Sequence, residues 1–200
     1  MGKGRLEAFS DGVLAIILTI MVLELKVPHA EAGLEALRPL IPVFASYVLS
    51  FVNLGIYWNN HHHLLHATRR VDGAVQWANL HLLFWLSLFP FATGWMGENH
   101  FAPTPTAFYG FISLMAALAY YVLQRQIIAE QGRESIVARA VGSDFKGKLS
   151  PVAYLAAIPL AFVNQWLSGA LYVGVALMWL APDTRIARAL AQRDAPGDAQ

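Results

Sequence analysis

A carboxylic acid lies within the first apolar stretch of the sequence. Asp11 follows Ser10 in residues 6–25, and among residues 12–23 only Thr19 has a polar side chain. As a helix, residues 6–25 would be about 30 Å long, which matches the hydrocarbon thickness of a bilayer. Asp11 is therefore expected inside the membrane or at its edge, where a charged side chain is costly and indicates a function or a specific partner.

Histidines form the second group that could do chemistry. The cluster comprises His61, His62, His63 and His66. His62 and His66 are one helical turn apart, a spacing that can bind a metal from one helix face. The cluster contains no Asp or Glu, and membrane enzymes with histidine-bound iron need several such clusters. A membrane metal or redox enzyme is therefore the weaker hypothesis, and we expect structural histidines, one or two of which partner Asp11 or Arg5.

A helical wheel divides the first stretch into two faces. With Ile16 as the reference, one face is an apolar stripe that contains a single hydroxyl group. The stripe comprises Gly12, Ile16, Thr19, Ile20 and Leu23, with Phe9 close to the same line. Ser10 and Asp11 lie about 120–140° away from it. Taken alone, such a stripe fits helix packing or lipid contact as well as the lining of a pore.

Arg5 and Asp11 point about 120° apart on this helix, so we do not expect a direct ion pair between them. Each is expected to meet groups of the second and third apolar stretches. The candidate partners are His62, His63, Trp77 and Asn79. Phe9 and Ser10 are expected to belong to the same network, which would fix the first half of the helix to its own subunit without contacting ions. A proton-sensitive gate at Asp11 is the alternative.

The composition indicates a membrane protein. Of the 200 residues, 56% are hydrophobic and 14% are charged, whereas soluble domains have about 45–50% apolar and about 25% charged residues. The chain has no cysteine, and its formal net charge of +1 is too small to indicate a nucleic-acid partner. It also lacks a phosphate-binding loop, a Thr-Val-Gly-Tyr-Gly filter and regularly spaced arginines, so an ATP-driven pump, a carbonyl-lined filter and a voltage sensor of the usual kind are not expected.

Six apolar stretches predict an all-α fold with six transmembrane helices per subunit. The stretches are residues 6–25, 37–58, 74–96, 107–128, 149–166 and 167–180. Pro90 predicts a kink or a break in the third stretch, because proline removes a backbone hydrogen bond. Residues 1–182 are expected to form one membrane domain, and residues 183–200 a polar cytoplasmic tail.

Lysine and arginine are distributed unevenly between the two sides of this arrangement. Six spans place both termini and the second and fourth loops on one side, where 12 of the 14 Lys and Arg residues lie. Only Lys26 and Arg38 lie on the other side. The positive-inside rule therefore predicts that both termini are cytoplasmic.

The pattern Arg5-x-x-x-Phe9-Ser10-Asp11 at the start of the first membrane helix resembles the signature of the lysosomal potassium channels, the transmembrane protein 175 family. Further resemblance lies in residues 58–63, 71–72, 79–80 and 88–93. The likeness is to the short, single-repeat prokaryotic branch. It implies a homotetramer in the plasma (inner) membrane of a prokaryote, with the first helix of each subunit at the central axis.

The resemblance also implies a function, which is passive and potassium-preferring cation conduction without an enzymatic activity or a cofactor. By this likeness Ile16 aligns with the main hydrophobic constriction and Thr19 with a hydroxyl that aids selectivity, while Ile20 and Leu23 continue the pore lining. An apolar ring forces an ion to shed water, which potassium does more readily than sodium. We expect the preference to be modest. A proton-conducting channel or exchanger stays open as the main alternative.

Overall fold

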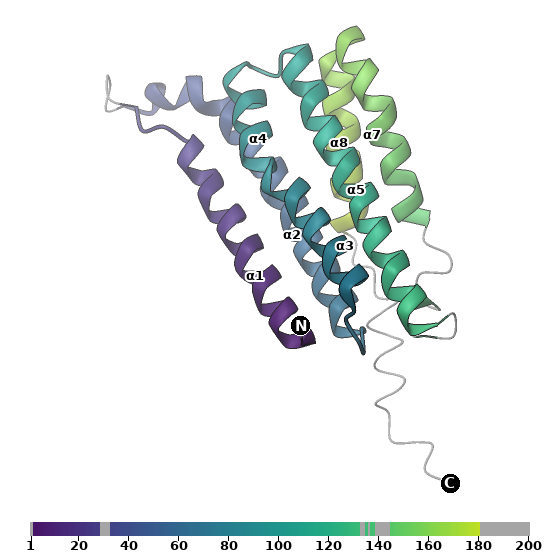
Figure 1. Cartoon of the computed structure of the whole chain (residues 1–200). Helices are drawn as coiled ribbons and strands as arrows, with labels where there is room; N and C mark the ends of the chain where they lie inside the picture. Colours follow the sequence, from purple (N-terminus) through teal and green to yellow (C-terminus); the bar gives the residue numbers. More distant parts are fainter. Residues whose placement is uncertain (1, 29–32, 133–134, 136, 139–144, 181–200) are drawn as a thin grey trace.

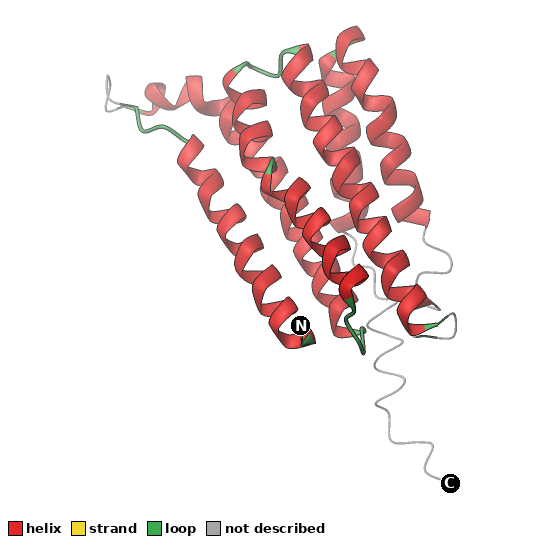
Figure 2. Ribbon diagram, viewed as in Figure 1, coloured by secondary structure: helices red, strands yellow, loops and turns green. Residues whose placement is uncertain are grey.

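The computed structural model describes residues 2–28, 33–132, 135, 137–138 and 145–180, and its regular elements are all helices (Figures 1 and 2). The α-helices are α1 (Lys3–Ile20), α2 (Ile41–His66), α3 (Gly73–Ser87), α4 (Phe89–Glu98), α5 (Pro103–Gln131), α7 (Phe145–Val163) and α8 (Gln165–Leu180). Short 3-10 helices at Met21–Glu24 and Leu34–Leu40 extend α1 and precede α2. Each of the six predicted stretches thus corresponds to one helix or to two consecutive helices. The predicted tail, residues 183–200, lies outside the described residues.

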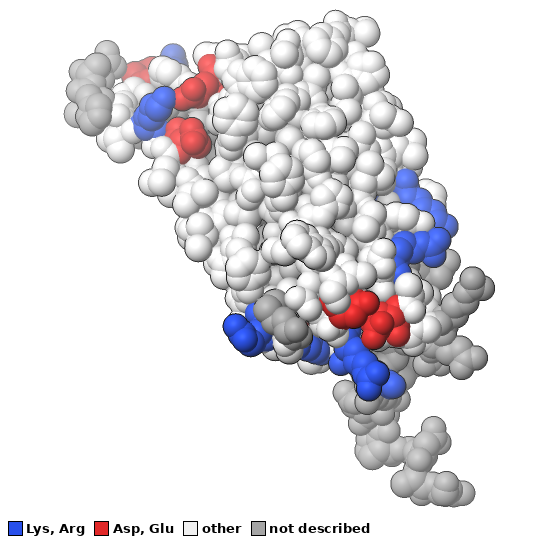
Figure 3. Space-filling model, in the orientation of Figure 1, with Lys and Arg blue, Asp and Glu red and all other residues white. Residues whose placement is uncertain are grey.

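Several of these helices are long and apolar enough to cross a membrane. In the described part of the chain four segments meet this criterion by length and composition: Lys3–Glu24, Leu34–His66, Gly73–Glu98 and Pro103–Gln131. α8 is apolar but shorter, with 16 residues. On the face shown in Figure 3, charged side chains gather towards the two ends of the bundle and leave an uncharged band between them. This distribution suits a bilayer.

The third stretch is broken as Pro90 predicts. α3 ends at Ser87 and α4 begins at Phe89, so Pro90 occupies the first turn of a new helix. The start of α3 is fixed by Asp72, whose carboxylate accepts a hydrogen bond from the backbone N–H of Val75 at 2.8 Å. Such a cap satisfies a backbone donor that a helix start leaves without a partner.

Several predicted boundaries differ from the structure. α2 continues to His66, beyond the predicted end of the second stretch at residue 58. α5 begins at Pro103, before the predicted stretch that starts at residue 107, because proline is tolerated in the first turn of a helix. α7 ends at Val163 and α8 begins at Gln165. The turn between them thus lies at Asn164, at the start of the turn that Asn164-Gln165-Trp166 and Ser168-Gly169 predict, although the predicted stretches divide later, between residues 166 and 167. The Asn164 side chain accepts a hydrogen bond from the backbone N–H of Trp166 at 2.9 Å, so this residue caps the start of α8.

The bundle places α1 at its edge, where it packs against α2 and α3 (Figure 1). α5 lies centrally and contacts both α3 and α7, and α8 packs against α7. Large buried side chains, among them Phe89, Tyr109 and Tyr172, fill the middle of the bundle. Conduction through one subunit would have to displace this packing, so a path for ions is more readily formed on an outer surface.

Gly97 allows α2 and α4 to approach closely. A Cβ atom added at Gly97 would lie 2.7 Å from the Cα atom of Val43 in α2. Gly97→Ala is therefore expected to lower the free energy of unfolding by about 1–3 kcal/mol, as overpacking usually does. Thermal unfolding of the detergent-solubilised protein measures this.

The matched control is Gly174→Ala in α8, where an added Cβ meets nothing within 4 Å. This change should leave the stability unchanged or raise it by up to about 1 kcal/mol, because alanine favours helix more than glycine does. Equal destabilisation by both changes would contradict the role given to Gly97.

Candidate functional site

The candidate site is the outer face of α1, which no other helix in the described part of the chain covers. The side chains on the inner face of α1 and its 3-10 extension are buried against the bundle. They are Leu6, Ser10, Leu14, Ile17 and Met21. The predicted stripe lies on the opposite face, where Ile16 is 61% exposed, Ile20 is 40% exposed and Leu23 is 75% exposed. Phe9 and Thr19 are exposed on the same face. The residues of the predicted stripe thus share one surface of the helix, and this surface is exposed in the single subunit.

Thr19 offers an oxygen acceptor in the middle of this apolar face. Its hydroxyl lies 2.9 Å from the carbonyl oxygen of Ala15 and 3.0 Å from that of Ile16, and it donates to them. Because the hydroxyl hydrogen is directed into the helix, the oxygen lone pairs stay available on the outer side. A hydroxyl held in this way can replace part of the water around a cation.

A buried chain of hydrogen bonds fixes the inner face of α1 to α2 and α3. Asn79 of α3 donates through Nδ2 to the Ser10 hydroxyl at 2.9 Å, and Ser10 donates to the carbonyl oxygen of Leu6 at 2.8 Å. The Asn79 Oδ1 atom lies 2.6 Å from Nε2 of His61 in α2. All three side chains are almost completely buried. Since an amide oxygen only accepts, His61 donates from Nε2.

The histidine that joins this buried network is His61, whereas the sequence prediction named His62 or His63 as the network histidines. The sequence carries a signal for this, because Leu54, Leu64 and Leu65 lie at helical spacings of seven, three and four residues from His61. These leucines are buried, so His61 shares the core-facing side of α2. His62 is exposed and His63 is half-buried, and neither bonds to Asp11 or Asn79 in the described structure.

Asp11 is bound by Trp58, which was not among its predicted partners. The Trp58 indole Nε1–H donates to the Asp11 carboxylate at 3.1 Å, on a partly exposed side of the helix pair. The Trp58 ring stacks on His62 with a centroid distance of 6.1 Å, and His62 stacks in turn on His66, also at 6.1 Å. His63 meets His62 edge-on. The predicted residues His62 and His63 therefore support the Trp58 ring rather than the carboxylate.

Two other predicted network residues lie apart from this contact. Trp77 is 75% exposed on the outside of α3. The Arg5 guanidinium has no ion-pair or hydrogen-bond partner among the residues that the structure describes. At this end of α1 it is Lys3 that connects to α2, by donating to the carbonyl oxygen of His66 at 2.8 Å.

The histidines do not form a metal site in the described structure. No group of three or more His, Asp or Glu side chains in this part of the chain is arranged to hold a metal ion. The rings of His62 and His66 are nearly parallel, at 14° to each other. This is a stacking arrangement, in which the two rings lie face to face.

The far end of α1 is tied to α4 by charged groups. Lys26 donates to Glu98 at 2.5 Å, and this hydrogen bond, together with the negative charge of Glu98, raises the pKa of Lys26. The Glu24 carboxylate rests against α4 at Gly94, where an added Cβ atom would lie 2.7 Å from its Oε2 atom and the Glu24 side chain would have to shift. Both ends of α1 are thus attached to the bundle while the stripe between them faces outward.

Sequence comparisons relate the chain to known channels. A family model described as the endosomal/lysosomal potassium channel TMEM175 matches residues 5–90. A protein of Chryseobacterium sp. (strain P1-3) named as a potassium channel is 51% identical over 190 residues, which cover 95% of this chain and 98% of that protein. A protein of Streptomyces collinus named as a potassium channel is 34% identical over 88% of this chain and 91% of its own length.

A solved structure has the same fold. The crystal structure of a lysosomal potassium-selective channel TMEM175 homolog from Chamaesiphon minutus matches with a TM-score of 0.79 and 29% identity, over 90% of this chain and 97% of that one. The human protein named as the endosomal/lysosomal proton channel TMEM175 is 33% identical over 103 residues, which are 46% of this chain and 20% of that protein. These relatives are named as channels, which are not enzymes, and the several membrane-length apolar helices of this chain indicate a multi-pass membrane protein.

Proposed function

The chain belongs to the TMEM175 potassium channel family, and from this premise we propose that it forms a passive, potassium-preferring cation channel. Four identical subunits would surround a central axis in the plasma membrane of a prokaryote, with both termini in the cytoplasm. Two relatives that match over most of the chain are named potassium channels, and this supports the choice of ion. The earlier alternative of a membrane metal or redox enzyme is dropped, because the family consists of channels.

One observation carries the assignment of the pore. α1 is an edge helix whose inner face is buried, while Ile16, Ile20 and Leu23 stay exposed in a line along its outer face. When four subunits meet, this line becomes a stack of apolar rings with the Thr19 hydroxyls between them. The packed interior of the single bundle supports a shared path between subunits.

The chemistry of these rings favours potassium modestly. A narrow ring of isoleucine side chains disfavours liquid water, so a cation must shed part of its hydration shell to pass. Potassium holds its water less tightly than sodium and loses it at a lower cost in free energy. The Thr19 oxygens replace part of the lost water, but an apolar ring provides no complete cage of ligands, which limits the selectivity.

The anchoring network keeps this line of side chains in place. Ser10, Asn79 and His61 set the rotation of α1 against α2 and α3, because a rotated helix would break two short buried hydrogen bonds. Asp11 contributes through Trp58 rather than by contact with the ion. In this function the acid is a structural residue.

Proton conduction is the second candidate, because vertebrate relatives that match part of the chain are named proton channels. The experiment that separates the two measures potassium flux, sodium flux and proton leak in the same liposomes with the purified protein. We expect potassium flux above sodium flux and both far above proton leak. A dominant proton leak, or equal transport of potassium and sodium, would contradict the proposal. Native mass spectrometry of the same preparation tests the tetramer by its mass.

A further inference from the structure

Arg5 lies on the same line of α1 as the exposed apolar stripe. On a helical wheel it is about 20° from Ile16 on one side, and Phe9 is about 20° away on the other. Both side chains are exposed, Phe9 by 48%. The other charged residues of α1 lie about 140–180° from Ile16, on the opposite side of the helix. They are Lys3, Glu7 and Asp11. The outer face of α1 therefore carries one charged residue, and it is a cation.

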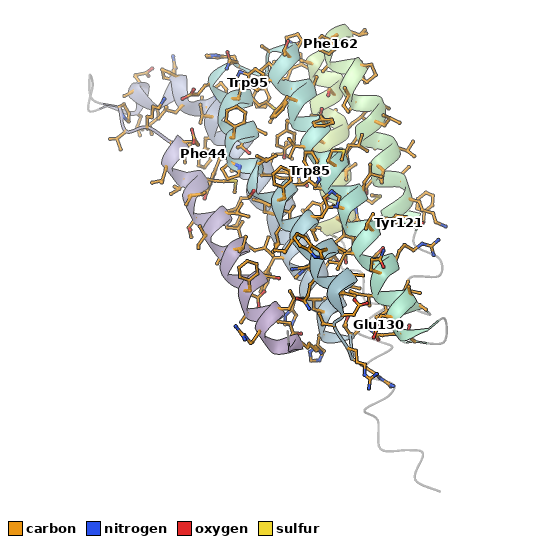
Figure 4. All side chains as sticks on the ribbon, in the orientation of Figure 1. Phe44, Trp85, Trp95, Tyr121, Glu130 and Phe162 are labelled. Carbon is orange, nitrogen blue, oxygen red and sulfur yellow. The ribbon has the colours of Figure 1, made fainter. Side chains whose placement is uncertain are left out.

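No carboxylate in the described part of the chain neutralises Arg5. Glu7 pairs with Lys3 at 3.7 Å, and Asp11 is bound by the tryptophan of α2. The acid at the start of α3 caps that helix. Figure 4 shows Glu130 at the same end of the bundle but on α5, whereas α1 packs against α2 and α3. The positive charge at the first turns of α1 is thus left uncompensated within the subunit.

The other end of the stripe, beyond Leu23, differs in charge. The described lysine and arginine there are both paired, Lys26 with Glu98 and Arg38 with Glu35. An ion pair has no net charge, so these cations contribute little field at a distance. Among the residues that the structure describes, an uncompensated cation in line with the stripe thus occurs at one end only.

We propose that the four Arg5 side chains form a positively charged ring at the cytoplasmic mouth of the pore and make its conduction asymmetric. This inference rests on the proposed tetramer, in which the outer face of α1 meets the axis, and on a cytoplasmic N-terminus. The ring repels potassium ions that arrive from the cytoplasm and lowers their concentration at the entrance. Ions from the outside enter without this repulsion. Inward potassium current therefore exceeds outward current at equal and opposite voltages.

The size of the effect depends on salt, because ions in solution screen the ring. Four unit charges about 10 Å from a cation lower its local concentration about threefold in 0.1 M salt, where the Debye length is about 10 Å. The same charges have an effect of about sevenfold in 0.01 M salt and almost none in 1 M salt. An arginine that served only the packing of the helix would produce no such dependence on salt.

The test measures potassium currents through the full-length protein in inside-out membrane patches, with equal KCl on both sides. We expect the inward current to exceed the outward current about threefold in 0.1 M KCl and to equal it in 1 M KCl. Arg5→Gln should make the two currents equal at either concentration. Arg5→Lys keeps the charge and should keep the asymmetry, while Arg5→Glu should reverse it.

A second measurement separates charge from folding. The chain has no cysteine, so Arg5→Cys introduces a single thiol. A cationic methanethiosulfonate reagent applied to the cytoplasmic side should restore the larger inward current, and an anionic one should make the outward current larger. Because the currents before and after the reaction come from the same assembled channels, a change in folding cannot produce this result.

The matched control is Arg125→Gln, which removes an exposed arginine from α5, a helix that packs against α3 and α7. It should leave the current ratio unchanged. Equal currents in the wild type at 0.1 M KCl, an unchanged ratio in Arg5→Gln, or a loss of asymmetry in Arg5→Lys as complete as in Arg5→Gln would overturn the ring. Each of these outcomes leaves potassium conduction intact, whereas a lack of potassium flux in liposomes would overturn the proposed function itself.

Discussion

Ile16→Asn is expected to raise cation flux through reconstituted protein about tenfold and to bring the potassium and sodium fluxes closer together. The exposed Ile16 side chain is placed at the proposed constriction, where an amide in each subunit would let water fill the ring. Hydrated ions would then pass with a smaller loss of water. Tenfold corresponds to about 1.4 kcal/mol less barrier, a modest change for the removal of one apolar ring. Potassium and sodium flux in liposomes measure both effects.

The control for this change is Leu177→Asn in α8. Leu177 is 61% exposed, the same fraction as Ile16, but it lies on a different helix. An asparagine there makes a similar chemical change at an equally exposed position without touching the proposed pore. Unaltered flux and ion preference in Ile16→Asn, or the same changes in Leu177→Asn, would remove Ile16 from the constriction.

Asn79→Leu is expected to have the largest effect on stability. It removes the shared partner of Ser10 and His61, both of which are almost completely buried. Two buried polar groups would lose a partner, at about 1–3 kcal/mol each, so the free energy of unfolding should fall by about 2–6 kcal/mol. We expect a lower melting temperature and a smaller oligomer fraction in size-exclusion chromatography.

Two comparisons sharpen the Asn79 result. Gln76→Leu, one turn earlier on α3, should change the stability by less than about 0.5 kcal/mol, because the half-buried Gln76 has no side-chain hydrogen bond within the described structure. Asp11→Ala breaks only the partly exposed bond to Trp58 and should cost about 1 kcal/mol while leaving ion preference unchanged. A normal oligomer yield with a selective loss of conduction in Asp11→Ala would contradict the structural role of the acid.

Much of the fold follows from the sequence alone because the signals are local. The apolar stretches are long enough to span a bilayer, and Pro90 ends the regular bonding of one of them at the observed break between α3 and α4. The start of α5 at Pro103, before the predicted stretch, also has a local reason. Proline fits the first turn of a helix as readily as a loop, so its presence does not distinguish the two.

The separation of α1 into two faces could also be predicted from the sequence, because a helical wheel needs only the residue order and the angle per residue. It placed Ile16, Ile20 and Leu23 on one side and Ser10 on another, as the structure has them. What the wheel left undecided was which side meets the bundle. Only the tertiary structure decides this, since it depends on where α2 and α3 lie around α1.

The partners across helices were likewise decided only by the tertiary structure. Four neighbouring histidines are chemically equivalent in the sequence, and a difference of one residue turns a side chain by 100°. That rotation directs His61 towards Asn79 and His62 towards Trp58. The sequence thus determined that a polar network anchors a helix with an apolar outer stripe, whereas the packing of three helices selected its members, because hydrogen bonds require distances that residue order does not contain.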